Sequence, residues 1–323
     1  MAANRKSGAA VAVGQGLIGF ALVTVGVVAT LGTILGFFGS AWWFFDFAAN
    51  FRAHLAVVLL IVALAYSLVF SKAIGLFFMA MAAVNGLLVL PLYSADPAPA
   101  AGDDSMTIVS FSVEQRASIR DATFRWISIV DPDVVVLVDS TDDWLRSEEL
   151  ALPYKFQNDL PADRAYGIAI LSKDSLNTEI LTASAVRDAV VRIEAVIGDQ
   201  PIVIYAVQSR PASNSTDADY RDEYLAEVGR MARAETDPTV VVGDLQATPW
   251  SHAFQDLADD AALENSMAGF GLQTTWPADR WAFFRIPIDH LLHSSELTTI
   301  DRYLGPHFGV DHRPLVVKLG VTT

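Results

Sequence analysis

The 323-residue sequence contains no cysteine, so no disulfide bond can hold any part of its fold together. Any globular domain in this chain must therefore be stabilised by its buried apolar side chains. The absence of cysteine is compatible with an exported domain, but it does not by itself indicate one.

Basic residues are also scarce, with 22 Lys and Arg against 37 Asp and Glu, which gives a net charge of −15. Four acidic and four basic residues precede Met106, so the whole imbalance falls on the residues after it. A surface this acidic repels a polyanion, which makes long nucleic acid a poor candidate partner. Ordinary solubility would also account for such a charge.

The first part of the chain has little charge of either sign and contains three long apolar runs, at about residues 16–39, 55–70 and 73–93. The first run has 24 positions without a charge, and at a rise of about 1.5 Å per residue it can cross a hydrocarbon core about 30 Å thick. We expect three transmembrane helices, the last two joined as a tight hairpin at Ser71 and Lys72. A cleaved signal peptide is disfavoured because its apolar core is usually about 7–15 residues long, and because two further spans follow.

The basic residues beside these runs predict an orientation. Arg5 and Lys6 precede the first run, Lys72 lies between the second and third, and residues 94–105 contain no Lys or Arg. The positive-inside rule then places the N-terminus in the cytoplasm and everything after residue 94 outside. The prediction is an integral plasma (inner) membrane protein with an extracytoplasmic domain, and Arg52 in the first loop is the one charge that opposes it.

Within the predicted spans, Gly32 and Gly36 form a GxxxG pattern and Asn85 is a lone polar residue. Both features favour close packing between the helices, and a partner protein or a lipid pathway is the alternative. The aromatic residues at positions 42–45 are typical of a membrane interface.

Residues 94–105, rich in Pro, Ala and Asp, predict an extended linker, and residues 106–323 predict one globular domain. Strands are expected at 107–112, 133–138, 167–172, 189–197, 201–208, 239–244, 288–294 and 313–320, and helices at 116–130, at 217–235 and from Pro249. Paired strands in the middle with helices at both flanks predict an α/β fold, a four-layer α+β sandwich of two stacked mixed sheets flanked by helices.

Polar residues of catalytic type lie at the ends of these predicted strands. Each one alone is explained by the preference of Asp, Ser and Gln for turns. Strand ends at one edge of a sheet converge, however, so together they indicate a site. The residues are Ser112, Glu114, Asp139, Gln208, Asp244, Gln246, Asp289, Asp311 and His312.

The order of these segments resembles the endonuclease/exonuclease/phosphatase superfamily of metal-dependent phosphohydrolases. "VVVGDLQATPWS" (240–251) is similar to the family's Gly-Asp-Phe-Asn-Ala-Thr-Pro, and "GVDHRPLVV" (309–317) is similar to Ser-Asp-His-Arg-Pro. "PDVVVLVDS" (132–140), "GIAILSK" (167–173), "TTWP" and "IPIDHLLHS" match other motifs of the family in order. The resemblance covers essentially all of residues 106–320.

The resemblance implies a mechanism in which a divalent cation polarises a phosphoryl oxygen and water attacks in line. His312, oriented by Asp289, would be the acid/base dyad, and Asp244 would orient or activate the water.

The resemblance also implies that Asp139 and Asp311 are metal ligands, with Glu114 as a possible helper. Oxygen ligands without cysteine favour Mg²⁺, Mn²⁺ or Ca²⁺ over zinc.

Four positions depart from the family pattern. Ser112 and Gln246 stand where the family has Asn, Asp139 where it has Glu, and Gln208 where it usually has His or Tyr. Asp139 withdraws its carboxylate by roughly 1.5 Å, an error that can cost ~100-fold in rate, and loss of one oxyanion donor costs ~10²–10³. Arg210, beside Gln208, could supply the lost cation.

Two interpretations follow from these departures. In the first, the domain is a divalent-metal-dependent phosphodiesterase or phosphatase acting near the membrane surface, on phospholipid or lipid-linked phosphate. In the second, catalysis has decayed and the domain binds an envelope lipid, a glycopolymer or other membrane proteins. His290 and His293 flank Leu291 and Leu292 of a buried strand and are expected to be structural.

Overall fold

A computed structural model describes residues 2–94, 101–141, 144, 154–159, 167–183 and 188–322. The chain forms two compact units, Met1–Leu90 and Pro91–Thr323.

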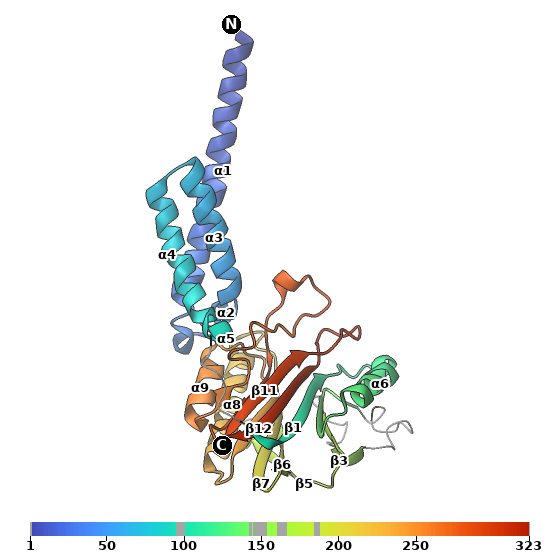
Figure 1. Ribbon diagram of the computed structural model, residues 1–323. Helices are drawn as coiled ribbons and strands as arrows, with labels where there is room; N and C mark the ends of the chain where they lie inside the picture. The colour runs from blue at the N-terminus through green and yellow to red at the C-terminus, as the bar shows by residue number, and fades with distance from the viewer. Residues whose placement is uncertain are drawn as a thin grey trace. The chain divides into compact units, whose positions relative to one another are not determined.

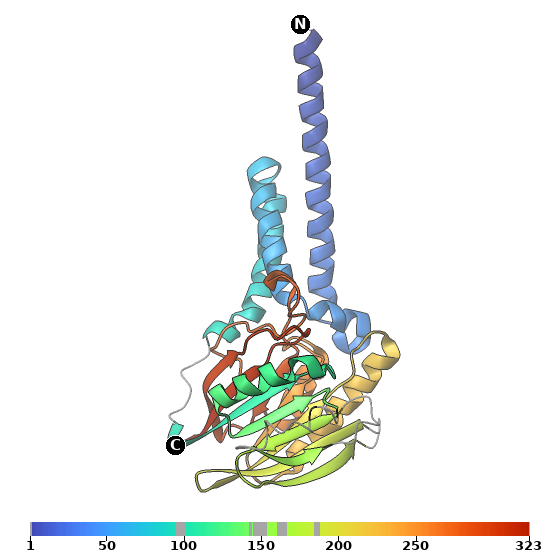
Figure 2. The same ribbon diagram turned by 90° about the vertical axis from the view of Figure 1, so that its right-hand side faces the viewer.

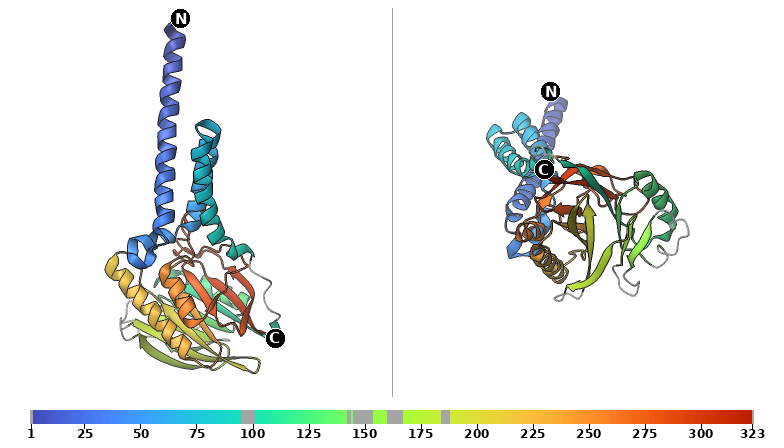
Figure 3. Two further views of the ribbon diagram at one scale, coloured as in Figure 1. Left: turned by 90° about the vertical axis from the view of Figure 1, so that its left-hand side faces the viewer. Right: turned by 60° about the horizontal axis from the view of Figure 1, so that its bottom comes forward.

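The first unit is helical and contains α1 (Ala2–Leu35), η1 (Gly39–Ala41), α2 (Trp43–Ala49), α3 (Arg52–Val69) and α4 (Lys72–Val89). The segments Gly14–Leu35, Arg52–Val69 and Lys72–Val89 are long and apolar enough to cross a membrane (Figures 1 and 3). The first predicted span was too long at its C-terminal end, because α1 ends at Leu35 and the chain turns at Gly36.

A buried polar network joins α1, α3 and α4. Arg52 Nη1 donates to the Thr33 carbonyl oxygen at 2.7 Å and to Asn85 Oδ1 at 3.5 Å, and Asn85 Nδ2 donates to Thr33 Oγ1 at 2.8 Å. Arg52 therefore differs from the expected loop charge, since it begins α3 and is only 2% exposed. The network supports the packing interpretation of Asn85, and the close approach of Arg52 to Gly36 does the same for the GxxxG pattern.

The second unit contains two six-stranded mixed sheets. The first sheet has the order β11-β12-β1-β2-β4-β3 and the second has β5-β6-β7-β8-β10-β9. Their bounds are β1 (Ala101–Ser112), β2 (Val134–Val138), β3 (Lys155–Asp159), β4 (Ile168–Ser172), β5 (Asn177–Ala183), β6 (Asp188–Ile197), β7 (Gln200–Gln208), β8 (Thr239–Asp244), β9 (Glu264–Asn265), β10 (Asp289–His293), β11 (Leu297–Leu304) and β12 (Leu315–Thr322).

Helices cover the outer faces of both sheets. The helical elements of this unit are α5 (Pro91–Ser94), η2 (Ala117–Ile119), α6 (Arg120–Val130), α8 (Ser215–Ala234), α9 (His252–Ala261) and η4 (Ala282–Phe284). Figure 2 shows α6 in front of the first sheet, and the left panel of Figure 3, viewed from the opposite side, shows α8 and α9 in front of the second. The four-layer fold predicted from the sequence is confirmed.

Three apolar clusters correspond to the three interfaces between these layers. Ile108, Val136, Ile204 and Val242 belong to the core between the sheets. Phe111 and Leu137 alternate with that set and pack against α6, while the other face of the second sheet packs on α8 and α9. This alternation follows from the two-residue repeat of a strand whose two faces are both covered.

Several elements of this unit differ from those predicted from the sequence. β1 begins at Ala101, so residues 101–105 belong to a strand and not to the predicted linker, whose residues 95–100 lie outside the described part of the chain. The last helix begins at His252 and not at Pro249. Strands β3, β5, β9 and β11 were missed; β5 is largely exposed, and β11 mixes polar and apolar residues without a regular alternation.

Candidate active site

Strand register brings three of the predicted site residues of the second sheet together. β7 and β8 are parallel and pair Gln208 with Asp244, and β8 and β10 are antiparallel and pair Asp244 with Asp289. Gly243 permits this arrangement because its φ is +146° and a Cβ atom there would collide with the Val207 carbonyl oxygen. The Gly-Asp of the sequence motif is thus a requirement of close strand packing as well as of chemistry.

The first sheet contributes the second half of the site. β1 and β2 are parallel and pair Ser112 with Val138, so Ser112 and Asp139 lie at neighbouring strand ends. Glu114 and Asp139 both have positive φ values, +48° and +55°, and the Asp139 carbonyl accepts from Gln115 N–H at 2.7 Å. Such left-handed residues at strand ends are typical of functional sites.

Gln208 connects the two halves. Its Oε1 accepts the Asp139 backbone N–H at 2.9 Å, and its side chain also hydrogen-bonds the Asp139 carboxylate. Burial raises the pKa of Asp139, and the hydrogen bond from Gln208 opposes that rise. The residue that departs from the family pattern therefore positions Asp139.

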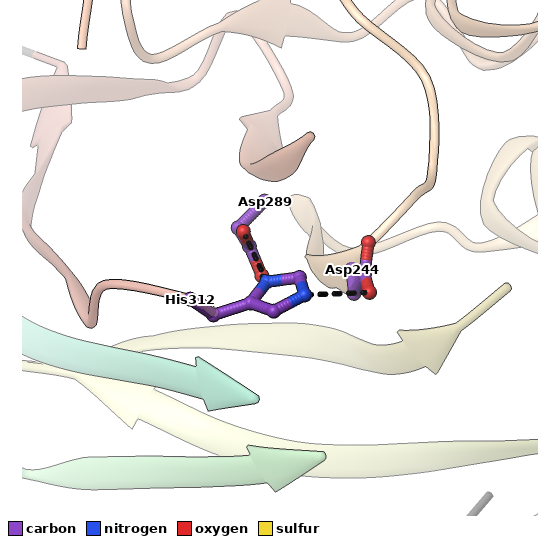
Figure 4. A group of neighbouring side chains, drawn as sticks. All are labelled: Asp244, Asp289 and His312. Atoms are coloured by element: carbon purple, nitrogen blue, oxygen red, sulfur yellow. Dashed lines mark hydrogen bonds and ion pairs between the residues drawn. The ribbon is translucent and has the colours of Figure 1, made fainter. Parts of the chain in front are cut away.

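His312 lies between two buried carboxylates (Figure 4). Its Nδ1 is 2.9 Å from Asp289 Oδ2, and its Nε2 is 3.9 Å from Asp244 Oδ2. Asp289 is held in turn by Thr275, whose Oγ1 accepts the Asp289 backbone N–H at 3.2 Å. The structure thus brings together the predicted dyad and the predicted water-orienting carboxylate.

The charges of this group are strongly perturbed. Burial, together with the nearby charge of Asp289, raises the pKa of Asp244 to about 7. Burial lowers the pKa of His312, but the charge and hydrogen bond of Asp289 and the charge of Asp244 outweigh it and raise that pKa to about 10. At neutral pH these values make His312 an imidazolium paired with Asp289 and place the titration of Asp244 near pH 7.

Gln246 fixes the Asp244 carboxylate. Its backbone N–H donates to Asp244 Oδ1 at 3.0 Å and its Nε2 donates to Oδ2 at 2.7 Å. Gln246 has a positive φ of +52°. Like Gln208, it is placed by the backbone against a carboxylate.

The three residues predicted as metal ligands all lie next to strands of the first sheet: Glu114 follows β1, Asp139 follows β2 and Asp311 precedes β12. Glu114 and Asp139 are half-buried and burial raises the pKa of each, whereas Asp311 is exposed. Glu114 Oε1 accepts the Asp311 backbone N–H at 2.5 Å, and carboxylate oxygens are the kind of donor that suits Mg²⁺, Mn²⁺ or Ca²⁺. The hydroxyl of Ser112 is buried without a hydrogen-bond partner in the described part of the chain, which leaves it available to a ligand.

Asp244, Asp289 and His312 also lie close enough to one another to be considered as metal ligands. The hydrogen bond between His312 Nδ1 and Asp289 also gives this imidazole the partner that a proton-transfer dyad requires.

Arg210 does not join the site as an unpaired cation. Its guanidinium makes two hydrogen bonds to Asp188, at 2.7 and 2.9 Å, and stacks over Tyr220. The cation that the sequence suggested for the place of the family's His is thus already neutralised.

His290 and His293 are structural, as expected. His290 Nε2 contacts the backbone oxygens of Ala247 and Pro287, and burial lowers the pKa of His290 to about 4. His293 contacts the Ser294 carbonyl and Thr299 Oγ1.

Two supporting residues were not identified from the sequence. Thr275 accepts a hydrogen bond from the Asp289 backbone. It belongs to the "TTWP" segment, whose similarity to the family did not predict a role for this residue. Arg302 is buried on β11, where its Nε donates to Ser266 Oγ and its Nη1 to Gln273 Oε1. Burial lowers the pKa of Arg302 to about 9, and the charge of Asp289 opposes that shift. No motif in the sequence marked this residue.

The site residues after Asp139 lie within a segment that matches a known protein family. A model of the endonuclease/exonuclease/phosphatase family matches residues 117–317, more than half of the chain. The chain belongs to this family. A search of curated protein sequences finds no match.

Solved structures show the same fold at low sequence identity. D. rerio TDP2 in complex with a single-strand DNA product has a TM-score of 0.57 and 16% identity, covering 68% of this chain and 100% of that one. An AP endonuclease from Archaeoglobus fulgidus has a TM-score of 0.55 and 14% identity, covering 66% and 98%. The 3′ phosphatase NExo from Neisseria, bound to a product DNA hairpin, has a TM-score of 0.54 and 18% identity, covering 66% and 98%.

Replacement of Gln208 tests its role in positioning Asp139. Gln208→Ala removes the hydrogen bonds to the Asp139 backbone and carboxylate, so Mn²⁺ affinity is expected to fall about 10-fold or more. Titration of the purified protein with Mn²⁺, followed by electron paramagnetic resonance, measures this. Gln255→Ala, on the exposed face of α9, is the matched control, and equal affinity in the two variants would contradict the role.

The pKa values of the buried group predict a pH dependence of stability. Because the pKa of His312 rises from 6.5 to about 10 on folding, the folded state keeps an extra proton between these values. This contribution to stability is complete below pH 6.5 and is lost as the pH rises through 10. With a chelator present to keep metal ions away, the free energy of unfolding should decrease as the pH is raised from 7 to 10.

The matched variants for this test are His312→Gln and His252→Gln. His252 begins α9 and lies near Asp256 at a partly exposed position, so its variant should keep the wild-type slope of stability against pH. His312→Gln should show a shallower slope in denaturant titrations. A slope as steep as that of the wild type would show that His312 is not held as an imidazolium.

Proposed function

We propose that this protein is a divalent-metal-dependent phosphodiesterase or phosphatase anchored in a membrane. The observation that carries the proposal is His312 bonded to Asp289, with Asp244 on the other side of the ring, within a fold of the phosphohydrolase family. The required chemistry is attack of water on phosphorus and departure of an alkoxide, which needs a base and an acid at opposite ends of the reaction.

The two buried groups match these needs at neutral pH. Asp244, with a pKa of about 7, accepts a proton from the attacking water, and its carboxylate is held in place by Gln246. His312, kept as an imidazolium by Asp289, stabilises the charge that develops on the phosphoryl group or donates a proton to the leaving oxygen. Both side chains are largely buried, so their charges act at a lower effective dielectric than at the protein surface.

Asp139, Asp311 and Glu114 would hold the divalent cation, with Gln208 fixing Asp139. The bound cation would supply Lewis-acid polarisation of a phosphoryl oxygen. Ser112, whose Oγ has no hydrogen-bond partner in the described part of the chain, would contact the phosphate, together with Gln208 and Gln246.

The apolar helices support a membrane location for this reaction. We infer that the three spans anchor the chain in the plasma (inner) membrane, with the N-terminus cytoplasmic and the family domain outside. A tethered domain samples the space near its membrane, which raises the effective concentration of membrane-borne phosphate esters. Phospholipid or lipid-linked phosphate is therefore the proposed substrate class; the DNA products of the structural neighbours fit poorly with the −15 charge of this chain.

One observation favours the second candidate function, a binding module without catalysis. Because Asp188 neutralises Arg210, that guanidinium does not replace the cation that a family His would offer. Such a domain would still bind a phosphate-bearing lipid, a glycopolymer or a membrane-protein partner through the same polar groups.

Turnover by the full-length protein in detergent separates these candidates. We expect metal-dependent hydrolysis of bis-p-nitrophenyl phosphate, and a loss of about 10³-fold or more in His312→Ala and in Asp244→Asn. His252→Ala, at a partly exposed histidine of α9, should keep wild-type turnover. Wild-type protein that is no faster than these variants with Mg²⁺, Mn²⁺ or Ca²⁺ would contradict the enzyme and favour the binding module.

A further inference from the structure

An ordered loop beside the candidate active site exposes several aromatic side chains. In residues 276–285, Trp281 is 83% exposed, Phe284 60% and Phe283 47%. An open cleft of about 630 Å³ is lined by Asp279, Arg280, Trp281 and Phe284. Exposed apolar side chains that gather in this way mark an interaction surface, whereas single ones need no explanation.

The loop is held in shape by its own hydrogen bonds. Trp276 and Ile286 form a two-way backbone bridge that closes the loop, with distances of 2.6 and 3.0 Å. Inside it, Phe284 N–H donates to the Trp281 carbonyl at 2.8 Å, and Arg285 Nε donates to the Arg280 carbonyl at 2.8 Å. The aromatic side chains are thus presented by a preorganised backbone, which lowers the entropy cost of docking.

The base of the loop is built into the site. Ala278 N–H donates to the Asp311 carbonyl at 2.5 Å, and Arg313 N–H donates to the Thr275 carbonyl at 3.1 Å. Thr275 Oγ1 also accepts the Asp289 backbone N–H. The base of the loop is therefore hydrogen-bonded to Asp311 and Arg313, the two residues that flank His312 in the chain.

A short connection joins this domain to the last predicted span. Three residues after the end of α4, the Leu92 carbonyl accepts Gly271 N–H at 2.6 Å, and Gly271 packs against the Tyr93 ring. Trp276, where the loop begins, follows Gly271 by five residues in the chain. A tether this short confines the domain to the space next to the membrane that α4 is proposed to cross.

We propose that residues 276–285 dock on the phospholipid surface from which α4 emerges and place the active site at the level of the lipid headgroups. Trp and Phe side chains partition into the interfacial region of a bilayer. Arg280 pairs with Asp279 at 3.5 Å, and Arg285 leaves residues 276–285 with a net charge of +1 (two Arg and one Asp) in an otherwise acidic chain, which suits lipid phosphates. This inference rests on the proposed membrane anchoring and deepens the proposed function, because it makes the substrate a phosphate ester carried by the bilayer itself.

The absence of native cysteine allows a direct test in the full chain. Trp281→Cys and Phe284→Cys are labelled with the fluorophore NBD and reconstituted in vesicles of phosphatidylcholine and phosphatidylglycerol at 4:1. Ile129→Cys on α6 is the matched control, since Ile129 is an exposed apolar residue at 81%.

We expect doxyl-labelled lipid to quench NBD at positions 281 and 284 at least threefold more than at position 129, and iodide to quench it less. Equal quenching by both agents at all three positions would overturn the proposal. These readouts need no turnover, so they remain informative if the protein proves not to be an enzyme.

A double variant tests the link to substrate. Trp281→Ser with Phe284→Ser changes only exposed side chains, so folding should be preserved. We expect turnover of vesicle phospholipid to fall at least tenfold, while turnover of bis-p-nitrophenyl phosphate stays within about twofold of wild type. An equal fall on both substrates, or no fall on either, would overturn the docking role; if wild type cleaves neither substrate, the proposed function fails and the quenching result alone decides the docking.

Discussion

The hydrogen bond between Asp289 and His312 is the contact on which the rest of the site depends. Asp289 is paired with Asp244 by strand register in one sheet, whereas His312 precedes the last strand of the other. Their 2.9 Å contact joins the two sheets at one edge and keeps a buried imidazole charged. The negative charges of Asp244 and Asp289 repel each other, and the positive charge of His312 offsets this repulsion. Without the positive charge, the two carboxylates could not both be ionised at neutral pH.

Gln208 is the second connection between the sheets, and its contacts give a physical reason for two of the departures from the family pattern. A shorter acid at position 139 and an amide at position 208 occur together, and the amide bonds both the backbone and the carboxylate of that acid. Gln246 similarly has a left-handed backbone and makes two hydrogen bonds to Asp244. Each substituted amide is thus engaged with a carboxylate of the site, which is more consistent with an adjusted site than with one that has lost its function.

Much of this arrangement follows from the sequence, and the failures have identifiable causes. The continuous valine runs before Asp139 and Asp244 are typical of buried strands. The order of the motifs predicted that these two aspartates lie at strand ends that converge on one site. The role of Gln208 could not be predicted, because it depends on a contact between residues 69 positions apart. The pairing of Arg210 with Asp188 and the burial of Arg52 were missed for the same reason: a charge in a sequence does not show which group, 22 or 19 residues away, will bind it.

The account depends most on the claim that water attacks phosphorus at this site. The most direct measurement is turnover of an alkyl phosphodiester by the full-length protein in H₂¹⁸O with Mn²⁺, with the products analysed by ³¹P nuclear magnetic resonance. The account predicts one ¹⁸O atom in each phosphate product, and no product after chelation of the metal. Release of unlabelled phosphate product, or no turnover with any divalent cation, would contradict it.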